Sequence, residues 1–131
     1  MSKRVNISSG SEWEGIIGYS RGVKIGNVIE LSGTTAMRNG KLVGEGDPYE
    51  QTKCALSIIK ESLKEAGAEI KDVVRTRIFM KDISQWEAVG KAHGEVFKDI
   101  KPATTILEVS KLISSFFFVD IFNNSNSYFL A

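Results

Sequence analysis

The sequence is poor in the residues that form disulfides and metal sites. It contains one cysteine, Cys54, and one histidine, His93, among its 131 residues. A lone cysteine excludes a disulfide within the chain, and a zinc site of the usual kind needs several clustered Cys or His ligands. The sequence therefore predicts no metal site, and we interpret Cys54 as a packing residue rather than a nucleophile.

The chain also lacks long apolar runs and a surplus of either charge. No segment approaches the roughly 18 consecutive apolar residues of a membrane helix, and the first residues lack the apolar core of a signal peptide. The formal net charge is +1, which leaves no basic footprint for nucleic acid or for an anionic membrane. We expect a cytoplasmic protein that binds neither membranes nor nucleic acid.

Length and composition predict a single domain over residues 1–131. With 42% hydrophobic residues, a chain of this size can bury one core. Residues 123–131 are atypical, because a run of Asn and Ser closes on aromatic residues. Such a run is a poor strand former, so we expect the last strand to stop near Phe122.

The first half of the chain predicts a hairpin followed by a helix. Residues 18–33 hold two runs rich in β-branched residues around the turn dipeptide Gly26-Asn27. Residues 38–47 are polar and rich in glycine, which favours a loop. Asp47 is the predicted N-cap of an amphipathic helix that runs to Gly67.

The middle of the chain predicts a third strand and a second helix. Apolar residues alternate over 73–81, which puts Val74 on the side that faces the helices. Ser84, with a glutamate three residues later, forms a predicted capping box. The helix that follows carries Trp86 and His93 on its apolar face, so we interpret His93 as a core or helix-edge histidine.

Residues 101–112 and 114–122 complete the predicted strands. Alternation places Thr104, Ile106 and Glu108 on one face, which we interpret as the face turned away from the helices. The order of elements is typical of an α+β two-layer sandwich, with a mixed sheet of about six strands and two helices on one face. The other face mixes polar and bulky apolar groups, so we expect further copies of the chain to cover part of it.

Short motifs recur along the chain in a recognisable order and spacing. They are Gly18-Tyr-Ser-Arg-Gly, Leu31-Ser-Gly-Thr, Glu65-Ala-Gly-Ala, Asp72-Val-Val-Arg-Thr, Met80-Lys-Asp-Ile and Lys101-Pro-Ala, the last continued by Leu107-Glu-Val-Ser-Lys-Leu. Together they resemble the reactive intermediate deaminase family (RidA, also called the YjgF or L-PSP endoribonuclease family). The resemblance extends from about Gly18 to Ile121.

This resemblance implies a chorismate-mutase-like fold that assembles as a homotrimer, with ligand clefts between neighbouring subunits. Deaminating members of the family hydrolyse the unstable enamines and imines that pyridoxal-phosphate enzymes release, which gives a 2-keto acid and ammonia. They require no cofactor. On this resemblance we expect a hydrolase for such intermediates, with a small-molecule ligand and no cofactor.

The family's cleft residues can be carried over position by position. Tyr19, Ser32 and Gly33 match cleft positions, and Asp120 falls where the family has a glutamate that positions water. The resemblance therefore implies that Ser32 and Asp120 handle water and that Tyr19 shapes the pocket. Aspartate is shorter than glutamate, so Asp120 would reach less far into the cleft.

Three cleft positions depart from the family. Thr104 stands at the carboxylate-binding arginine, Gly90 at a frequent asparagine and Ile106 at a frequent cysteine. Threonine offers one hydroxyl and no charge, so it cannot replace a bidentate guanidinium. Strand alternation puts Arg21 on the same face as Tyr19, which makes it a candidate substitute anchor; a solvated or ion-paired surface arginine is the alternative.

Several functions stay open on the sequence. The chain is an imine or enamine deaminase, a hydrolase for an uncharged or differently charged substrate, or a trimeric binding or protective module with little turnover. The strand face with Arg75, Arg77 and Lys81 adds an RNA-binding hypothesis. We rank it last, because such a face is usually solvated or paired with acids.

Overall fold

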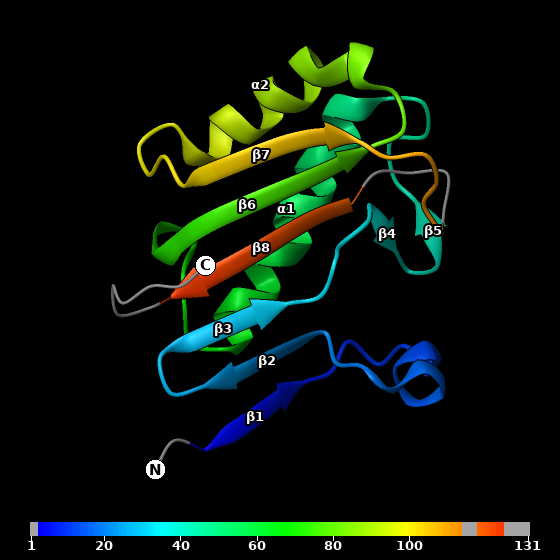
Figure 1. The fold of residues 1–131 in the computed structure, drawn as a ribbon. Helices are drawn as coiled ribbons and strands as arrows, with labels where there is room; N and C mark the ends of the chain where they lie inside the picture. The colour runs from blue at the N-terminus through cyan, green and yellow to red at the C-terminus, as the bar shows by residue number, and fades with distance from the viewer. Residues whose placement is uncertain (1–2, 114–117, 125–131) are drawn as a thin grey trace.

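A computed structural model describes residues 3–113 and 118–124, the last range by its backbone alone. Its main feature is one sheet of six strands in the order β1-β2-β3-β8-β6-β7 (Figure 1). Neighbours are antiparallel except β6 and β7, which are parallel. The strands are β1 (Arg4–Ile7), β2 (Gly22–Ile25), β3 (Val28–Leu31), β6 (Val73–Met80), β7 (Ala103–Glu108) and β8 (Phe118–Asn124).

Two helices, α1 (Pro48–Glu65) and α2 (Trp86–Phe97), cover the same face of this sheet (Figure 1). The predicted α+β sandwich with both helices on one side is therefore confirmed. The predicted cap is confirmed as well, since the Asp47 carboxylate accepts the Glu50 backbone N–H at 3.1 Å. At the other end of α1, Lys24 Nζ donates to the Ala66 carbonyl at 2.9 Å and places a positive charge at the helix C-terminus.

The core lies between the sheet and the helices. Burying each large apolar side chain contributes about 1.5–3 kcal/mol, so this layer fixes both helices and the central strands in place. Its most deeply buried large members are Ile29, Leu56, Ile59, Leu63, Ile78, Val89 and Phe97.

Short elements occur in two places where the sequence did not predict them. β1 pairs with β2 and extends the sheet beyond the predicted hairpin. Part of the predicted loop 38–47 instead forms a two-stranded ribbon of β4 (Met37–Arg38) and β5 (Lys41–Leu42). These strands are too short to show an alternating pattern of apolar residues. Backbone hydrogen bonds to the neighbouring strand stabilise them.

Two strands differ from the sequence prediction in detail. A register shift between Val73 and Arg75 against β8 turns Val73 into the core and leaves Val74 40% exposed. β8 continues to Asn124, so the predicted end near Phe122 is wrong. The strand lies between β3 and β6, where its backbone groups find partners on both sides, and this outweighs the low strand propensity of asparagine.

The start of α2 also differs from the prediction. The Ser84 capping box is wrong, because the Asp82 carboxylate accepts both the Ser84 N–H at 3.0 Å and its hydroxyl at 2.6 Å. A 3₁₀ turn, η3 (Ile83–Gln85), results and delays the helix to Trp86. Trp86, predicted on the apolar face, is 53% exposed because it is the first residue of the helix.

The face of β7 is the opposite of the predicted one. β7 pairs in parallel with β6, which sets Thr104 opposite Thr76, and their hydroxyl oxygens are 2.8 Å apart. Ile106 packs against the core. Glu108 accepts the Ile83 N–H at 3.0 Å. Thr104, Ile106 and Glu108 therefore lie on the face of β7 that is turned toward the helices. Alternation within β7 separates its two faces but does not show which of them faces the helices.

Candidate functional site

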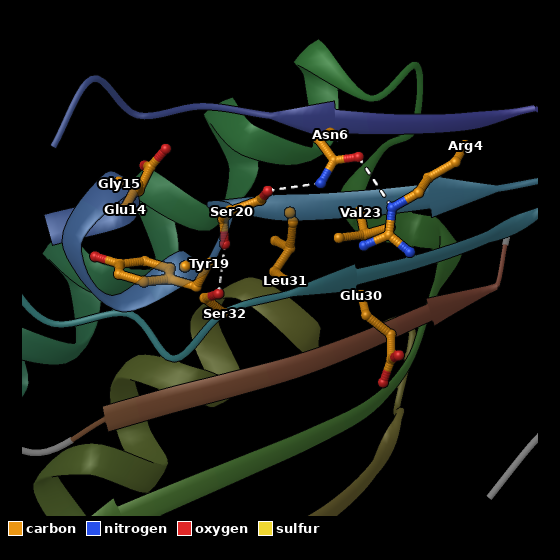
Figure 2. A pocket seen from close by; sticks show the side chains of 12 residues that line it. Arg4, Asn6, Glu14, Gly15, Tyr19, Ser20, Val23, Glu30, Leu31 and Ser32 are labelled. Carbon is orange, nitrogen blue, oxygen red and sulfur yellow. Dashed lines mark hydrogen bonds between the residues drawn. The ribbon is translucent and has the colours of Figure 1, made fainter. Parts of the chain in front are cut away.

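An open hollow of about 650 Å³ lies beside the β2–β3 hairpin. A π-helical turn, η1 (Glu14–Gly18), forms one wall, and Figure 2 shows the side chains of Tyr19 and Ser32 next to each other in it. Gly18 has a φ of +87°, a backbone conformation that favours glycine, and it ends the turn just before Tyr19. The structure thus brings together two of the predicted site residues, and Gly33 follows directly after Ser32.

Hydrogen bonds connect the polar side chains that line the hollow. Arg4 Nε donates to Asn6 Oδ1 at 3.0 Å, and Asn6 Nδ2 donates to Ser20 Oγ at 2.8 Å (Figure 2). The Ser32 hydroxyl donates to the Ser20 carbonyl at 2.6 Å. Because its proton is engaged there, the Ser32 oxygen faces the hollow as an acceptor, suited to a water molecule or an amine.

Glu14 supplies a negative charge at the wall of the hollow. Its carboxylate accepts the Ser9 N–H at 2.8 Å and the Ser8 hydroxyl at 2.9 Å, and it also accepts the Ser9 hydroxyl. These bonds, those from Ser9 first, hold the pKa of Glu14 below its usual range. The side chain is therefore ionised at neutral pH.

Arg21, the candidate substitute anchor, points into the structure. Its Nη2 donates to the Ser32 carbonyl and, at 2.6 Å, to the Thr34 hydroxyl, while its Nε is buried without a hydrogen bond. Burial lowers the pKa of the Arg21 guanidinium. Arg21 therefore fixes the chain after β3, and it does not line the hollow.

The predicted residue Thr104 belongs to a second group of polar side chains, on β6, β7 and α2. Thr104 Oγ1 lies 2.8 Å from Thr76 Oγ1, which in turn lies 2.9 Å from His93 Nε2. Thr104 Oγ1 also donates to the Pro102 carbonyl at 3.1 Å. Burial lowers the pKa of His93. No charged donor stands where the family's arginine would.

The other two residues that differ from the family's usual ones, Ile106 and Gly90, lie close to this second group of side chains. Ile106 follows on the same face of β7, and Gly90 stands one helical turn before His93 on α2. A Cβ added at Gly90 would meet only the Trp86 ring, at 4.0 Å, so the position is open. We call Thr104, Ile106, Gly90 and His93, with Thr76, the edge region, and the lining of the hollow the hairpin region.

The two regions lie apart within one chain. β8 and β6 stand between β3 and β7, so three strand spacings, about 14 Å, separate them across the sheet. Asp120 lies on the intervening β8, with its backbone opposite Arg77. One chain therefore does not bring Thr104 next to Tyr19 and Ser32.

Sequence reasoning missed the partners that complete both regions. Asn6 and Glu14 line the hollow, but they lie on β1 and η1, which had no clear signal. The sequence predicts a core or helix-edge position for His93 and gives no signal for its bond to Thr76, since a pattern does not show a hydrogen bond between two elements. Within the described residues, no group of three or more His, Cys, Asp or Glu side chains could hold a metal ion, and no helix could cross a membrane.

Comparison with known proteins identifies relatives over most of the chain. The family described as Endoribonuclease L-PSP matches residues 10–121. An uncharacterized protein of Streptomyces coelicolor is 43% identical over 109 residues, which covers 83% of this chain and 81% of that protein. A protein of Acinetobacter baylyi named 3-aminoacrylate deaminase RutC is 32% identical, over 70% of this chain and 73% of its own length.

Solved structures agree with these matches. A Mycobacterium tuberculosis protein, described as a member of the YjgF/YER057c/UK114 family, superposes with a TM-score of 0.84 at 40% identity. The match covers 93% of this chain and 99% of that one. The order of strands and helices described above is therefore shared with an experimentally determined relative.

Proposed function

Because the chain belongs to the endoribonuclease L-PSP family, also known as the YjgF/RidA family, we propose that it hydrolyses reactive enamines or imines to a carbonyl compound and ammonia. The observation that carries this proposal is the hollow in which Tyr19 and Ser32, both at family cleft positions, lie side by side. The name of the Acinetobacter relative, a deaminase of 3-aminoacrylate, supports the same reaction class.

In this proposal the hairpin region binds the attacking water. The Ser32 oxygen accepts a hydrogen bond from water, because its own proton is donated to the Ser20 carbonyl. Asp120 orients the same water, and Tyr19, which is 40% exposed in one chain, closes the pocket around the substrate. Water adds to the imine carbon, ammonia leaves, and the carbonyl forms.

The edge region is where this chain differs from the family in how it would bind the substrate carboxylate. Thr104 shares its hydroxyl with Thr76 and the Pro102 carbonyl and offers a ligand no charge. A hydrogen bond to a charged group contributes about 1.5–3 kcal/mol, so a carboxylate is held at least about ten-fold more weakly than by arginine. We propose that the preferred substrate has no carboxylate at this place, or one held by other groups.

We further propose that the chain works as a homotrimer with clefts between its copies. The separation of the hairpin and edge regions across β8 and β6 supports this. The exposed apolar side chains Trp13, Ile16 and Ile17 beside the hollow would be covered by a neighbour. Sedimentation equilibrium should give three times the 14.4 kDa of one chain, and a monomer would contradict the proposal.

The direct test of the reaction is a coupled assay. A dehydratase generates 2-aminoacrylate or its four-carbon homologue in the cuvette, and the rate of keto-acid appearance is measured with and without the protein. We expect the natural chain to accelerate keto-acid formation, and we expect the charge added in Thr104→Arg to lower the KM for the substrate. No acceleration by either protein rejects the deaminase proposal.

A non-catalytic binding module is the second candidate, and the uncharged Thr104 position favours it. It predicts that keto acids bind in the cleft while neither protein accelerates their formation. An RNA-acting role ranks last, because Arg75 Nη2 is already hydrogen-bonded to Thr105 Oγ1 at 2.6 Å. Retention on RNA that falls steeply with salt would be needed to revive it.

A further inference from the structure

A continuous chain of hydrogen bonds links the single histidine to the outer edge of the sheet. His93 Nε2 lies 2.9 Å from Thr76 Oγ1, and Thr76 Oγ1 lies 2.8 Å from Thr104 Oγ1. Thr76 is fully buried at 0% exposure, His93 is half-buried and Thr104 is exposed. The chain of bonds therefore begins at a half-buried ring, passes through a fully buried hydroxyl and ends at an exposed one.

The proton positions along this chain can reverse. The Thr104 hydroxyl has one proton and two acceptors within reach, the Pro102 carbonyl at 3.1 Å and Thr76 at 2.8 Å. If it donates to Pro102, the bonds run outward and His93 Nε2 carries a proton. If it donates to Thr76, they run inward and Nε2 accepts. Both arrangements satisfy the two hydroxyls and the ring nitrogen.

His93 is suited to accept a proton at neutral pH. Burial lowers its pKa, which keeps the ring neutral. The ring is held against Phe97, with the two centroids 4.6 Å apart. In the hairpin region, by contrast, the Ser32 hydroxyl donates to a backbone carbonyl, which cannot take up its proton.

We propose that His93 is the proton acceptor of the reaction and acts through Thr76 on the hydroxyl of Thr104, which contacts the ligand or its attacking water. This inference rests on the proposed hydrolysis of imines. It assigns a role to Thr104 that differs from the carboxylate anchoring of the family's arginine. Thr104 is then the group in contact with the reacting atoms, and His93 and Thr76 act through it.

The proton balance of the step is simple. As water adds to the imine carbon, a C–O bond forms and the C=N π pair moves to nitrogen. One water proton passes to Thr104 Oγ1, the Thr104 proton to Thr76 Oγ1 and the Thr76 proton to His93 Nε2. The imidazolium returns the proton along the same path to the amine nitrogen, which gives a neutral carbinolamine. The hydroxyl proton of the carbinolamine then travels to His93 and back to the nitrogen by the same path. As the oxygen pair forms the C=O bond, the C–N bond breaks and ammonia leaves.

The connection can be tested without any turnover, because the sole histidine gives unambiguous NMR signals. Imidazole ¹⁵N shifts report which ring nitrogen carries the proton. In Thr104→Val, Thr76 loses its acceptor on β7, so we expect the ring to shift toward the Nδ1–H form. Thr105→Val, the same change on the other face of β7, should leave the signals unchanged. Unaltered histidine signals in Thr104→Val overturn the inference.

The catalytic role is tested in the coupled assay. His93→Gln keeps a side-chain N–H for Thr76 but cannot take up a proton, so we expect kcat to fall about 100-fold while KM changes little. Wild-type kcat in His93→Gln overturns the relay and leaves the proposed function standing. A silent natural chain that still shows the Thr104→Val effect by NMR rejects the proposed function and supports the connection.

Discussion

The hairpin region and the edge region differ in what the hydroxyl of the family-position residue is bonded to. In the hairpin region, the Ser32 hydroxyl donates to the backbone carbonyl of Ser20. In the edge region, Thr104, Thr76 and His93 are bonded to one another. The departures from the family pattern at Thr104, Gly90 and Ile106 lie in the edge region, and Asp120, which is shorter than the family's glutamate, lies on β8. Tyr19 and Ser32, which match the family, thus lie together in the hairpin region, whereas the edge region holds a threonine where the family has arginine.

Restoring the family's charge should have the largest effect. Thr104→Arg adds a guanidinium at the cleft, and we expect 2-oxobutyrate to bind at least about ten-fold more tightly by isothermal titration calorimetry. Thr105→Arg adds the same charge on the other face of β7 and should change binding little. Equal affinity of Thr104→Arg and the natural chain would show that the edge region does not face the ligand.

Removing the buried Thr76 hydroxyl, which is hydrogen-bonded to both His93 and Thr104, should have the next largest effect. Thr76→Val leaves His93 Nε2 and Thr104 without their shared partner at a position with 0% exposure. We expect the free energy of unfolding in urea to fall by about 1–3 kcal/mol. A loss below about 0.5 kcal/mol would mean that the hydrogen-bond chain contributes little stability.

Removing a hydroxyl from the hairpin region should lower the free energy of unfolding by less than Thr76→Val does. Ser32→Ala removes the donor to the Ser20 carbonyl at a half-buried position that water can reach. We expect a loss of about 0.5–1.5 kcal/mol in the same urea experiment. If this variant is less stable than Thr76→Val, the contrast between the two regions is reversed.

The two regions should also respond to acid at different pH values. The pKa of His93 is lowered by burial from 6.5, so the unfolded chain takes up its proton first and stability falls as the pH drops below about 6.5. The pKa of Glu14 is lowered from 4.5 by its bonds to Ser9, so its contribution is lost only below about 4.5. Urea midpoints measured between pH 7.5 and 5 should fall slightly for the natural chain and stay level for His93→Gln. Equal slopes would contradict this assignment.

The smallest effect is expected at Gly90. An asparagine there has open space, since the nearest atom to an added Cβ is in the Trp86 ring at 4.0 Å. Asparagine is slightly better than glycine inside a helix, so Gly90→Asn should change the unfolding free energy by less than about 0.5 kcal/mol. A loss above about 1 kcal/mol would show that the edge region cannot accept the family's residue.

Local signals predicted most of the fold, and long-range pairing decided the rest. The turn at Gly26-Asn27 and the cap at Asp47 lie within a few residues of the structure they specify, and both are confirmed. The face of β7 depends on its pairing with β6, where Thr104 meets Thr76 at a separation of 28 residues. Alternation within one strand cannot show which of its two faces is turned toward the helices.

One part of the candidate site could likewise be predicted from the sequence, and another part could not. The family resemblance predicted that Tyr19 and Ser32 share a cleft, and one chain places them together. It could not reveal the hydrogen bond of His93, because an apolar helix face is the same pattern whether its histidine is isolated or bonded to Thr76. The bond depends on the packing of α2 over β6, which brings together residues 17 positions apart.

Cross-linking between copies tests the central claim, that the hairpin and edge regions form one cleft across two chains. In a Tyr19→Cys/Thr104→Cys variant, a short bismaleimide should join neighbouring copies and give covalent dimers and trimers on a denaturing gel. Each single variant should stay a monomer band, and buried Cys54 should not react. If both new cysteines are labelled and only the single-chain band appears, the hairpin and edge regions of neighbouring copies do not meet in one cleft.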